Sequence, residues 1–384
     1  MYVHPLRSPQ HNDEDMEFLS SFNSLHEDLY TEILIRLDAK SLARFKLVSK
    51  DWYLFLSNDY FTRHYSESRP SITGFFYETS TQYKEKLRYV SIDTKEDFVI
   101  DPPSCLGFLD GPARLVNSCN GLLHWVSSWD QQFISNPLTN KSVALPWPIP
   151  RHQFFACGIA FDPLVSDHFV VVVLLLQSRI NLKSRIFSSE TMEWGEMKEI
   201  VVIPHRPKPK CCKRGVFLNG FLHWEMTDNA ILVYDVKGQS GWMMKSPMND
   251  ELVEKLGFSE PGCLGGFGGK LHYCRVIGTL LCVWVATQYS SSNSTIWVEQ
   301  HSVNLYNVMC ENSSIIPHGS QALAFLCHGE EILLCVKGKI IGYRFDDNAV
   351  REVCKVQRSD GSHVEPSMFF PFVHTLALFN LPLR

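Results

Sequence analysis

The chain has 384 residues, of which 45% are hydrophobic and 20% are charged, a composition that is ordinary for a globular protein of one or two domains. Its 36 basic and 41 acidic side chains give a net charge of −5, which argues against nucleic acid or an anionic membrane surface as a partner. Because residues 1–20 are polar and predict no signal peptide, we expect the twelve cysteines to be reduced thiols and the protein to be cytoplasmic, nuclear or both.

Residues 1–20 are predicted to be disordered, and residues 21–66 to form a small unit of three amphipathic helices. Ser24 followed by Glu27 is a capping-box pattern for the first helix, and Asp38 and Ser49 are placed to cap the second and third helices. A unit of this size cannot bury all of its apolar side chains in its own core. We therefore expect the excess to contact a partner or the rest of the chain.

Two runs within this unit carry a family resemblance: EDLYTEIL at residues 27–34 and SLARFKLVSKDW at residues 41–52. With these runs, the segment resembles an F-box, the adaptor-binding module of Skp–cullin–F-box ubiquitin ligases, in its plant-type version. Family members usually have proline where this chain has His26 and Asp38. A proline at a first helical position contributes no hydrogen bond, so a capped alternative should cost little stability.

The resemblance implies that the helical unit binds a Skp-type adaptor, which links it through a cullin to the ubiquitin-transfer machinery. The side chains expected to contact the adaptor are the large apolar residues of the three helices. Some of them must instead hold the helices together, and the spacing alone does not separate the two roles. The candidates are Leu25, Leu29, Ile33, Leu34, Leu37, Leu42, Phe45, Val48 and Trp52.

From about Pro70 to the C-terminus, short runs rich in valine, isoleucine and aromatic residues alternate with clusters of glycine, asparagine, proline and serine, which is the pattern of an all-β region. Residues 67–100 are assigned to a linker and the first strands, and residues 101–384 to the main β domain. The longest apolar run, residues 169–176, is too short to cross a bilayer as a helix and predicts a buried strand.

A weak internal repeat marks the β region. NGLLHW at residues 120–125 recurs as NGFLHW at residues 219–224 and as GGKLHY at residues 268–273, at spacings of 99 and 49 residues. Each copy predicts a tight turn followed by an apolar strand. A period near fifty residues is typical of kelch-like propeller blades, and the β region has room for about six of them. An array of β-sandwiches is the alternative fold, but it gives no reason for this period.

Longer runs in the β region, such as LVNSCNGLLHW at residues 115–125 and IAFDPLVSDHF at residues 159–169, resemble the F-box-associated, kelch-related region of plant F-box proteins. The resemblance implies an α+β multidomain protein, in which a small all-α F-box module is followed by an all-β kelch-like propeller. On this assignment, the propeller is the part that binds a protein substrate.

Two sequence patterns in the β region resemble chemical sites. The repeat histidines His124, His223 and His272 could bind zinc if they converged near a propeller axis, but side chains one blade or more apart favour local hydrogen bonds instead. The glycine run at residues 262–270 lacks the hydroxyl residue and the helix of a phosphate-binding loop, so we predict an interblade turn there. No paired carboxylates or nucleophile motif stand out, and we predict no catalytic, cofactor-binding or metal site.

These inferences favour a non-catalytic substrate-recognition subunit of a Skp–cullin–F-box ubiquitin ligase, with no cofactor and an unidentified protein substrate. Two alternatives stay open. One is a propeller interaction protein that acts outside any ligase, which a failure to co-purify with the adaptor would favour. The other is a propeller-based hydrolase, which would require clustered carboxylates or a metal set on one face, because the fold alone does not fix the function.

Overall fold

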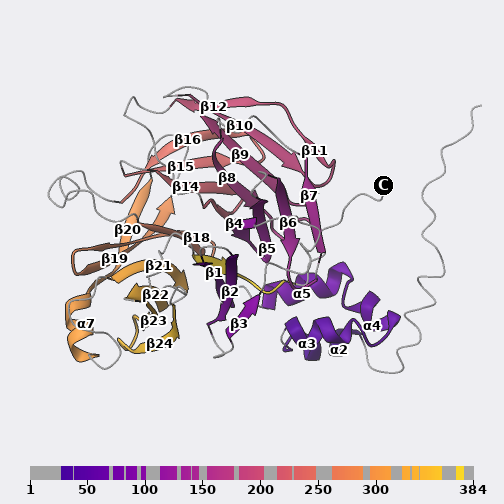
Figure 1. The fold of residues 1–384 in the computed structure, drawn as a ribbon, viewed down its shortest axis with the longest axis horizontal. Helices are drawn as coiled ribbons and strands as arrows, with labels where there is room; N and C mark the ends of the chain where they lie inside the picture. Colours follow the sequence, from indigo (N-terminus) through magenta and orange to yellow (C-terminus); the bar gives the residue numbers. More distant parts are fainter. Residues whose placement is uncertain are drawn as a thin grey trace, which may run out of the picture. The chain divides into compact units, whose positions relative to one another are not determined.

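The computed structural model divides the chain into two compact units, residues 1–69 and residues 70–384, which are described separately (Figure 1). No helix in the described part of the chain is long and apolar enough to span a membrane. The structure describes residues 27–37, 39–68, 72–81, 84–92, 97–100, 113–127, 131–139, 141–146, 154–176, 181–202, 214–226, 229–247, 262–288, 295–312, 322–328, 331–336, 338–356 and 369–375.

The described part of the first unit contains four short helices: α2 (Glu27–Leu34), α3 (Ala39–Phe45), α4 (Lys50–Phe55) and α5 (Asp59–Ser68). The predicted cap of α4 is confirmed, because Ser49 Oγ accepts a hydrogen bond from the backbone N–H of Trp52 at 3.2 Å. The segment predicted to be disordered, residues 1–20, lies outside the described residues, as do the predicted caps Ser24 and Asp38.

Helix α5 was not predicted from the sequence, although a local signal for it exists. Asn58 precedes the helix, and its Oδ1 accepts a hydrogen bond from the backbone N–H of Phe61 at 2.7 Å. Phe61 and Tyr65 follow four residues apart, so they lie on one face of α5, and both are fully buried. This helix therefore adds a further element to the core of the helical unit.

The described residues of the second unit form six antiparallel sheets, numbered here as blades 1 to 6 around a ring. Blade 1 contains β25 (Phe369–Phe372), β1 (Gly74–Thr81), β2 (Lys84–Ser91) and β3 (Asp97–Ile100), and blade 2 contains β4 (Ala113–Cys119), β5 (Leu122–Ser127), β6 (Gln132–Asn136) and β7 (Lys141–Leu145). Blade 3 contains β8 (Phe154–Ala160), β9 (Val170–Leu176), β10 (Asn181–Ser188), β11 (Glu193–Trp194) and β12 (Lys198–Val202).

Blades 4 to 6 continue the same arrangement, with each strand paired to the next one along the chain. Blade 4 contains β13 (Val216–Leu218), β14 (Phe221–Met226), β15 (Ala230–Asp235) and β16 (Ser240–Lys245). Blade 5 contains β17 (Cys263–Phe267), β18 (Lys270–Ile277), β19 (Leu280–Gln288) and β20 (Ile296–Asn304), and helix α7 (Leu305–Glu311) follows it. Blade 6 contains β21 (Ala322–His328), β22 (Glu331–Val336), β23 (Lys339–Arg344) and β24 (Val350–Lys355).

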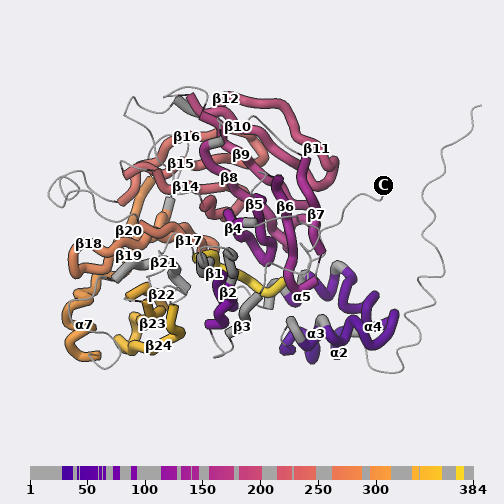
Figure 2. Tube along the Cα trace, in the orientation of Figure 1, coloured from indigo at the N-terminus to yellow at the C-terminus, as the bar shows by residue number. Residues whose placement is uncertain are grey.

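Blade 1 joins the two ends of the propeller sequence. The C-terminal strand β25 pairs with β1, from Gly74 opposite Phe372 to Tyr77 opposite Phe369. Figure 2 shows this yellow strand returning to the purple strand β1. Because one blade combines strands from both chain ends, the ring is closed by hydrogen bonds between segments that are far apart in sequence.

Apolar side chains fill the space between neighbouring blades. Trp125 of β5 shares a cluster with Phe76 of β1 between blades 2 and 1, and Trp224 of β14 shares one with Val172 of β9 between blades 4 and 3. Equivalent clusters join blades 2 and 3, 4 and 5, 5 and 6, and 6 and 1. A closed ring of six blades confirms the predicted propeller, whereas its kelch subtype stays a prediction.

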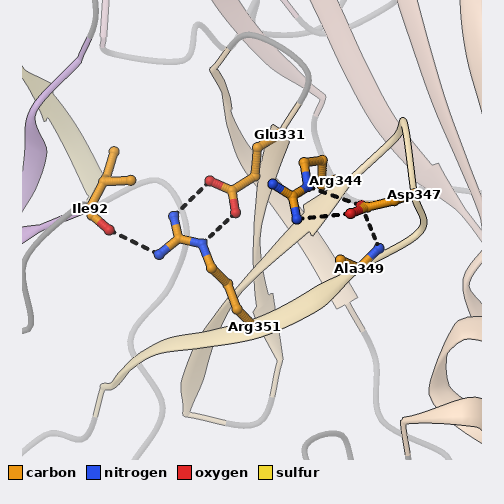
Figure 3. A network of polar contacts seen from close by, with 6 residues as sticks. All are labelled: Ile92, Glu331, Arg344, Asp347, Ala349 and Arg351. Atoms are coloured by element: carbon orange, nitrogen blue, oxygen red, sulfur yellow. Dashed lines mark hydrogen bonds and ion pairs between the residues drawn. The ribbon is translucent and has the colours of Figure 1, made fainter.

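A polar contact also links blade 6 to blade 1. Arg351 at the start of β24 forms a two-point ion pair with Glu331 of β22, with N···O distances of 2.6 and 2.7 Å (Figure 3). Its Nη1 donates a hydrogen bond to the carbonyl of Ile92, which follows β2, at 2.9 Å. Arginine presents its donors in a rigid planar fork, so one side chain can hold both partners at once.

The internal repeat corresponds to the hairpin turn between the first and second strands of blades 2, 4 and 5. The φ angles of Asn120 and Gly121 are 42° and 85°, and those of the equivalent Asn219 and Gly220 are 49° and 86°. Two successive positive φ angles define a type I′ turn, which Asn-Gly adopts readily. Gly268–Gly269 is the same turn within blade 5, so the prediction of an interblade turn at residues 262–270 was wrong.

Candidate functional site

The core of the helical unit draws on all four described helices. Its buried apolar side chains are Leu34 of α2, Leu42 of α3, Phe55 of α4, Leu56 directly after it, and Phe61 and Tyr65 of α5. The ring centroids of Phe55 and Phe61 are 5.5 Å apart, which joins α5 to α4. Leu34 and Leu42, two of the residues predicted to contact an adaptor, are therefore placed in the core of the unit.

Trp52 lies where three helices meet. Its ring centroid is 6.1 Å from that of Tyr30 on α2, 5.5 Å from that of Phe45 on α3 and 6.2 Å from that of Phe55 on its own helix. The contacts with Tyr30 and Phe55 are edge-to-face, an arrangement that aromatic pairs prefer. Because the indole is only half-buried, it stabilises the packing of the helices and still offers part of its surface to a partner.

A second group of predicted residues is exposed. Leu29 and Ile33 lie one turn apart on α2, and Ile33 is 59% exposed. Val48, just before α4, is 68% exposed, and its neighbour Leu47 is 86% exposed. Covering aliphatic side chains of this size with a partner removes apolar surface from water, which stabilises association. We call these four residues the exposed apolar group.

The remaining predicted residues belong neither to the buried core nor to the exposed apolar group. Leu37 and Phe45 are half-buried, and Leu25 lies outside the described residues. The prediction also missed several exposed apolar side chains, because it followed a single apolar face on each helix and ended with the third helix. The missed residues are Leu47, Tyr53, Leu54 and Tyr60.

The three repeat histidines are buried inside the propeller, His124 and His223 completely. His124 Nε2 is 3.0 Å from Gln132 Oε1, and its Nδ1 is 3.7 Å from Cys157 Sγ. His223 Nδ1 is 3.1 Å from the carbonyl oxygen of Val216. Burial lowers the pKa of both imidazoles to about 4, so both rings are neutral near pH 7.

The third repeat histidine, His272, also bonds locally: its Nδ1 is 3.1 Å from the carbonyl oxygen of Lys270. Burial lowers the pKa of this imidazole as well. Within the ranges that the structure describes, no group of three or more histidine, cysteine, aspartate or glutamate side chains is arranged to hold a metal ion. The geometry of the repeat histidines thus supports local hydrogen bonding.

The two Asn-Gly turns join neighbouring blades. Asn120 Nδ2 donates to the carbonyl of Phe161, which follows β8 in blade 3, at 2.7 Å, and Asn219 Nδ2 donates to the carbonyl of Gly269 in blade 5 at 2.8 Å. These contacts place the turns between first and second strands of successive blades on one face of the propeller, called here the turn face. Val165, in the loop between β8 and β9 on this face, is 74% exposed.

Comparison with known proteins gives two matching families. The model described as "F-box domain" matches residues 22–64, and the model described as "F-box associated beta propeller domain" matches residues 72–335. F-box protein At5g07610 of Arabidopsis thaliana is 24% identical over 91% of both chains, and F-box protein At5g49610 of the same plant is 25% identical over 87% of this chain and 92% of its own. Putative F-box protein At3g16210 of Arabidopsis thaliana is 27% identical, and that match spans about half of either protein, 52% and 53%.

Proposed function

This chain belongs to the F-box proteins that carry an F-box-associated β-propeller, and we propose that it is the substrate-recognition subunit of a Skp–cullin–F-box ubiquitin ligase. It binds a Skp-type adaptor through the helical unit and a protein substrate through the propeller, in the cytoplasm, the nucleus or both. It catalyses no step itself. Instead it raises the effective concentration of the substrate's lysines near the ubiquitin-transfer machinery.

The observation that carries this proposal is the exposed apolar group of the helical unit. All four members, Leu29, Ile33, Leu47 and Val48, lie within the residues matched by the F-box family. The unit already has a buried core drawn from its four helices, so these side chains are not needed to complete it. Such an apolar surface is removed from water when a partner packs its own helices or a groove against it.

Charged substitutions at the exposed apolar group test the adaptor contact. In the full-length chain, Ile33→Asp and Val48→Asp should each weaken binding of purified adaptor about thirtyfold, because a centrally placed interface residue is often worth about 2 kcal/mol. Val165→Asp is the matched control, since Val165 is equally exposed but lies on the propeller. Wild-type affinity in both helical variants would contradict this assignment of the binding surface.

The ligase assignment has its own test. Affinity purification of the wild-type chain from cells with the proteasome blocked should recover the Skp-type adaptor together with candidate substrates, identified by mass spectrometry. Recovery of other proteins without the adaptor would instead support a propeller that acts outside any ligase.

A further inference from the structure

Two buried cysteines face each other in the first hairpin of blade 5. Cys263 begins β17 and is directly opposite Cys274 of β18 in the antiparallel register. Opposed residues of an antiparallel pair point to the same face, and both thiols belong to the apolar cluster between blades 5 and 6. Opposed residues have Cα atoms about 4.5 or 5.5 Å apart, within the range of about 4.4–6.8 Å that disulfides span.

Arg214 brings a positive charge to the first of these thiols. It lies just before β13 in blade 4, and its Nη2 is 3.6 Å from Cys263 Sγ and 3.3 Å from the carbonyl oxygen of Leu264. Its Nη1 donates to the carbonyl of Phe369 in blade 1 at 2.6 Å. None of these partners is a carboxylate, so no direct ion pair with a described residue neutralises the guanidinium beside the sulfur. A cation next to a thiol favours its nucleophilic thiolate form.

Burial alone disfavours the thiolate form of two other cysteines of the propeller. Burial raises the pKa of Cys119 to about 12 and that of Cys335 to about 11. The Cys119 thiol contacts a carbonyl oxygen, that of Phe161, at 3.4 Å. Cysteines in such surroundings act as small apolar side chains. The Cys263 thiol also contacts a carbonyl oxygen, that of Leu264, at 3.7 Å, and in addition it has the guanidinium of Arg214 beside it and a thiol opposite it.

We propose that Cys263 and Cys274 form a reversible oxidation site, at which hydrogen peroxide converts the two thiols into a disulfide across the β17–β18 hairpin. The Cys263 thiolate attacks one peroxide oxygen, which forms a sulfenic acid and releases hydroxide, protonated to water. The Cys274 sulfur then attacks the sulfenic sulfur, forming the S–S bond and releasing a second water. The two sulfurs lose two electrons in total, the peroxide gains them, and a dithiol reductant reverses the change.

One of the two cysteines, Cys263, lies next to an arginine that joins three blades of the ring. Arg214 contacts blades 5 and 1 from blade 4, and Cys263 Sγ is one of its three partners. In the disulfide, that sulfur is bonded to Cys274 and can no longer become a thiolate, so the guanidinium loses a possible anionic neighbour at the inner strands of the propeller. Oxidation should therefore shift the unfolding temperature of the propeller.

The full-length protein, purified with reduced thiols, provides the main test. After brief exposure to hydrogen peroxide, alkylation and digestion, mass spectrometry should detect a linked peptide pair containing Cys263 and Cys274, which dithiothreitol removes. Cys119 should stay reduced, and the exposed Cys310 serves as the reference for peroxide reactivity. In Cys274→Ser, oxidation of Cys263 should stop at a sulfenic acid that dimedone traps.

Variants of Arg214 test the role of the charge. Arg214→Gln should slow oxidation of Cys263 about tenfold relative to Cys310, and Arg214→Lys, which keeps the charge, should restore most of the rate. Absence of the linked pair in the wild-type protein, or oxidation of Cys263 no faster than that of Cys119, overturns the proposal. Should Arg214→Gln fail to fold, as judged by circular dichroism, the wild-type and Cys274→Ser measurements decide it.

Discussion

In the propeller, the large aromatic residue of each repeat, Trp125, Trp224 or Tyr273, is almost completely buried against a neighbouring blade. In the helical unit, by contrast, Ile33 and Leu47 stay mostly exposed although the unit has a core of its own. A closed ring gives every blade two neighbours, whereas four short helices enclose too little volume to cover all their apolar side chains. The propeller therefore covers the aromatic side chains of its repeats with its own blades, whereas the helical unit leaves large aliphatic side chains exposed to water.

The strongest test of this contrast is removal of the C-terminal strand, which reopens the ring. A chain that ends at residue 368 loses β25 and with it three buried phenylalanines, Phe369, Phe370 and Phe372. Truncating one buried phenylalanine typically costs about 3 kcal/mol or more, so the combined loss exceeds the stability of an ordinary domain. We expect circular dichroism to show no cooperative thermal unfolding of the propeller.

A chain that ends at residue 375 is the control, because it keeps every propeller residue that the structure describes, and it should unfold as the full-length protein does. Cooperative unfolding of the shorter chain near the wild-type temperature would show that closure does not depend on β25.

Within the helical unit, Trp52→Ala should have the next largest effect. The indole contacts aromatic rings on α2, α3 and α4, and its removal should destabilise the unit by about 2 to 3 kcal/mol. Hydrogen–deuterium exchange of residues 27–68 in the full-length protein measures this loss of protection. Adaptor binding should also weaken, roughly thirtyfold for a loss of about 2 kcal/mol.

Tyr53→Ala provides the neighbouring control, since Tyr53 is exposed on the same helix and its truncation should leave exchange protection nearly unchanged. If Trp52→Ala keeps its protection and binds the adaptor as the wild type does, the ring belongs neither to the core nor to the interface.

The propeller should lose stability in mild acid. His124 and His223 have pKa values of about 4 when folded, below their ordinary value of 6.5. At pH values between about 4 and 6.5, the unfolded chain therefore binds protons that the folded chain does not bind. The contribution of the neutral rings to the free energy of unfolding is fully present above about pH 6.5 and is lost as the pH falls towards 4. From these pKa values, the free energy of unfolding at pH 5 should be lower than at pH 7.5 by about 2 kcal/mol for each of the two histidines.

Urea unfolding at pH 7.5 and pH 5.0 measures this dependence. His124→Gln should remove about half of the pH-dependent loss, whatever its effect at pH 7.5. His64 on α5 is the control, because His64→Gln changes a histidine of the helical unit and should leave the pH dependence of the propeller unchanged. Equal stability at both pH values in the wild type would show that these rings are not buried as the structure places them.

The smallest expected effect concerns the polar link between blades 6 and 1 (Figure 3). Arg351 is paired with Glu331, whose side chain is only 16% exposed, and also holds the carbonyl of Ile92. A double-mutant cycle with Arg351→Ala and Glu331→Ala should give a coupling of about 1 kcal/mol, at the upper end for such pairs. The more exposed pair Arg344–Asp347, whose side chains are 54% and 52% exposed, is the matched control and should give a smaller coupling. A coupling equal to that of the control would show that the partial burial of Glu331 does not strengthen its pair with Arg351.

The parts that could be predicted from the sequence depend on contacts between residues close along the chain. Ser49 caps α4 through a backbone N–H three residues away, and the Asn-Gly repeats form hairpin turns whose φ angles asparagine and glycine adopt readily. The same kind of local signal existed for α5, at Asn58 and Phe61, but the prediction ended before it. The repeat period and the family resemblance then predicted the propeller, and the family resemblance predicted the helical module.

By itself, then, the sequence determined the helical module, the Asn-Gly turns and the alternation of strands, because hydrogen bonding and side-chain periodicity within a few residues control these features. The expectation of about six blades came from the repeat period near fifty residues. Only the tertiary structure decided which side chains of the helical unit are core and which are exposed, since Leu34 and Ile33 are adjacent in sequence and differ only in what other helices cover. Tertiary contacts also joined β25 to β1, and Arg214 to Phe369 across 155 positions of the chain. The burial of a side chain and the pairing of distant strands depend on how helices and strands far apart in sequence pack together, which no pattern of neighbouring residues specifies.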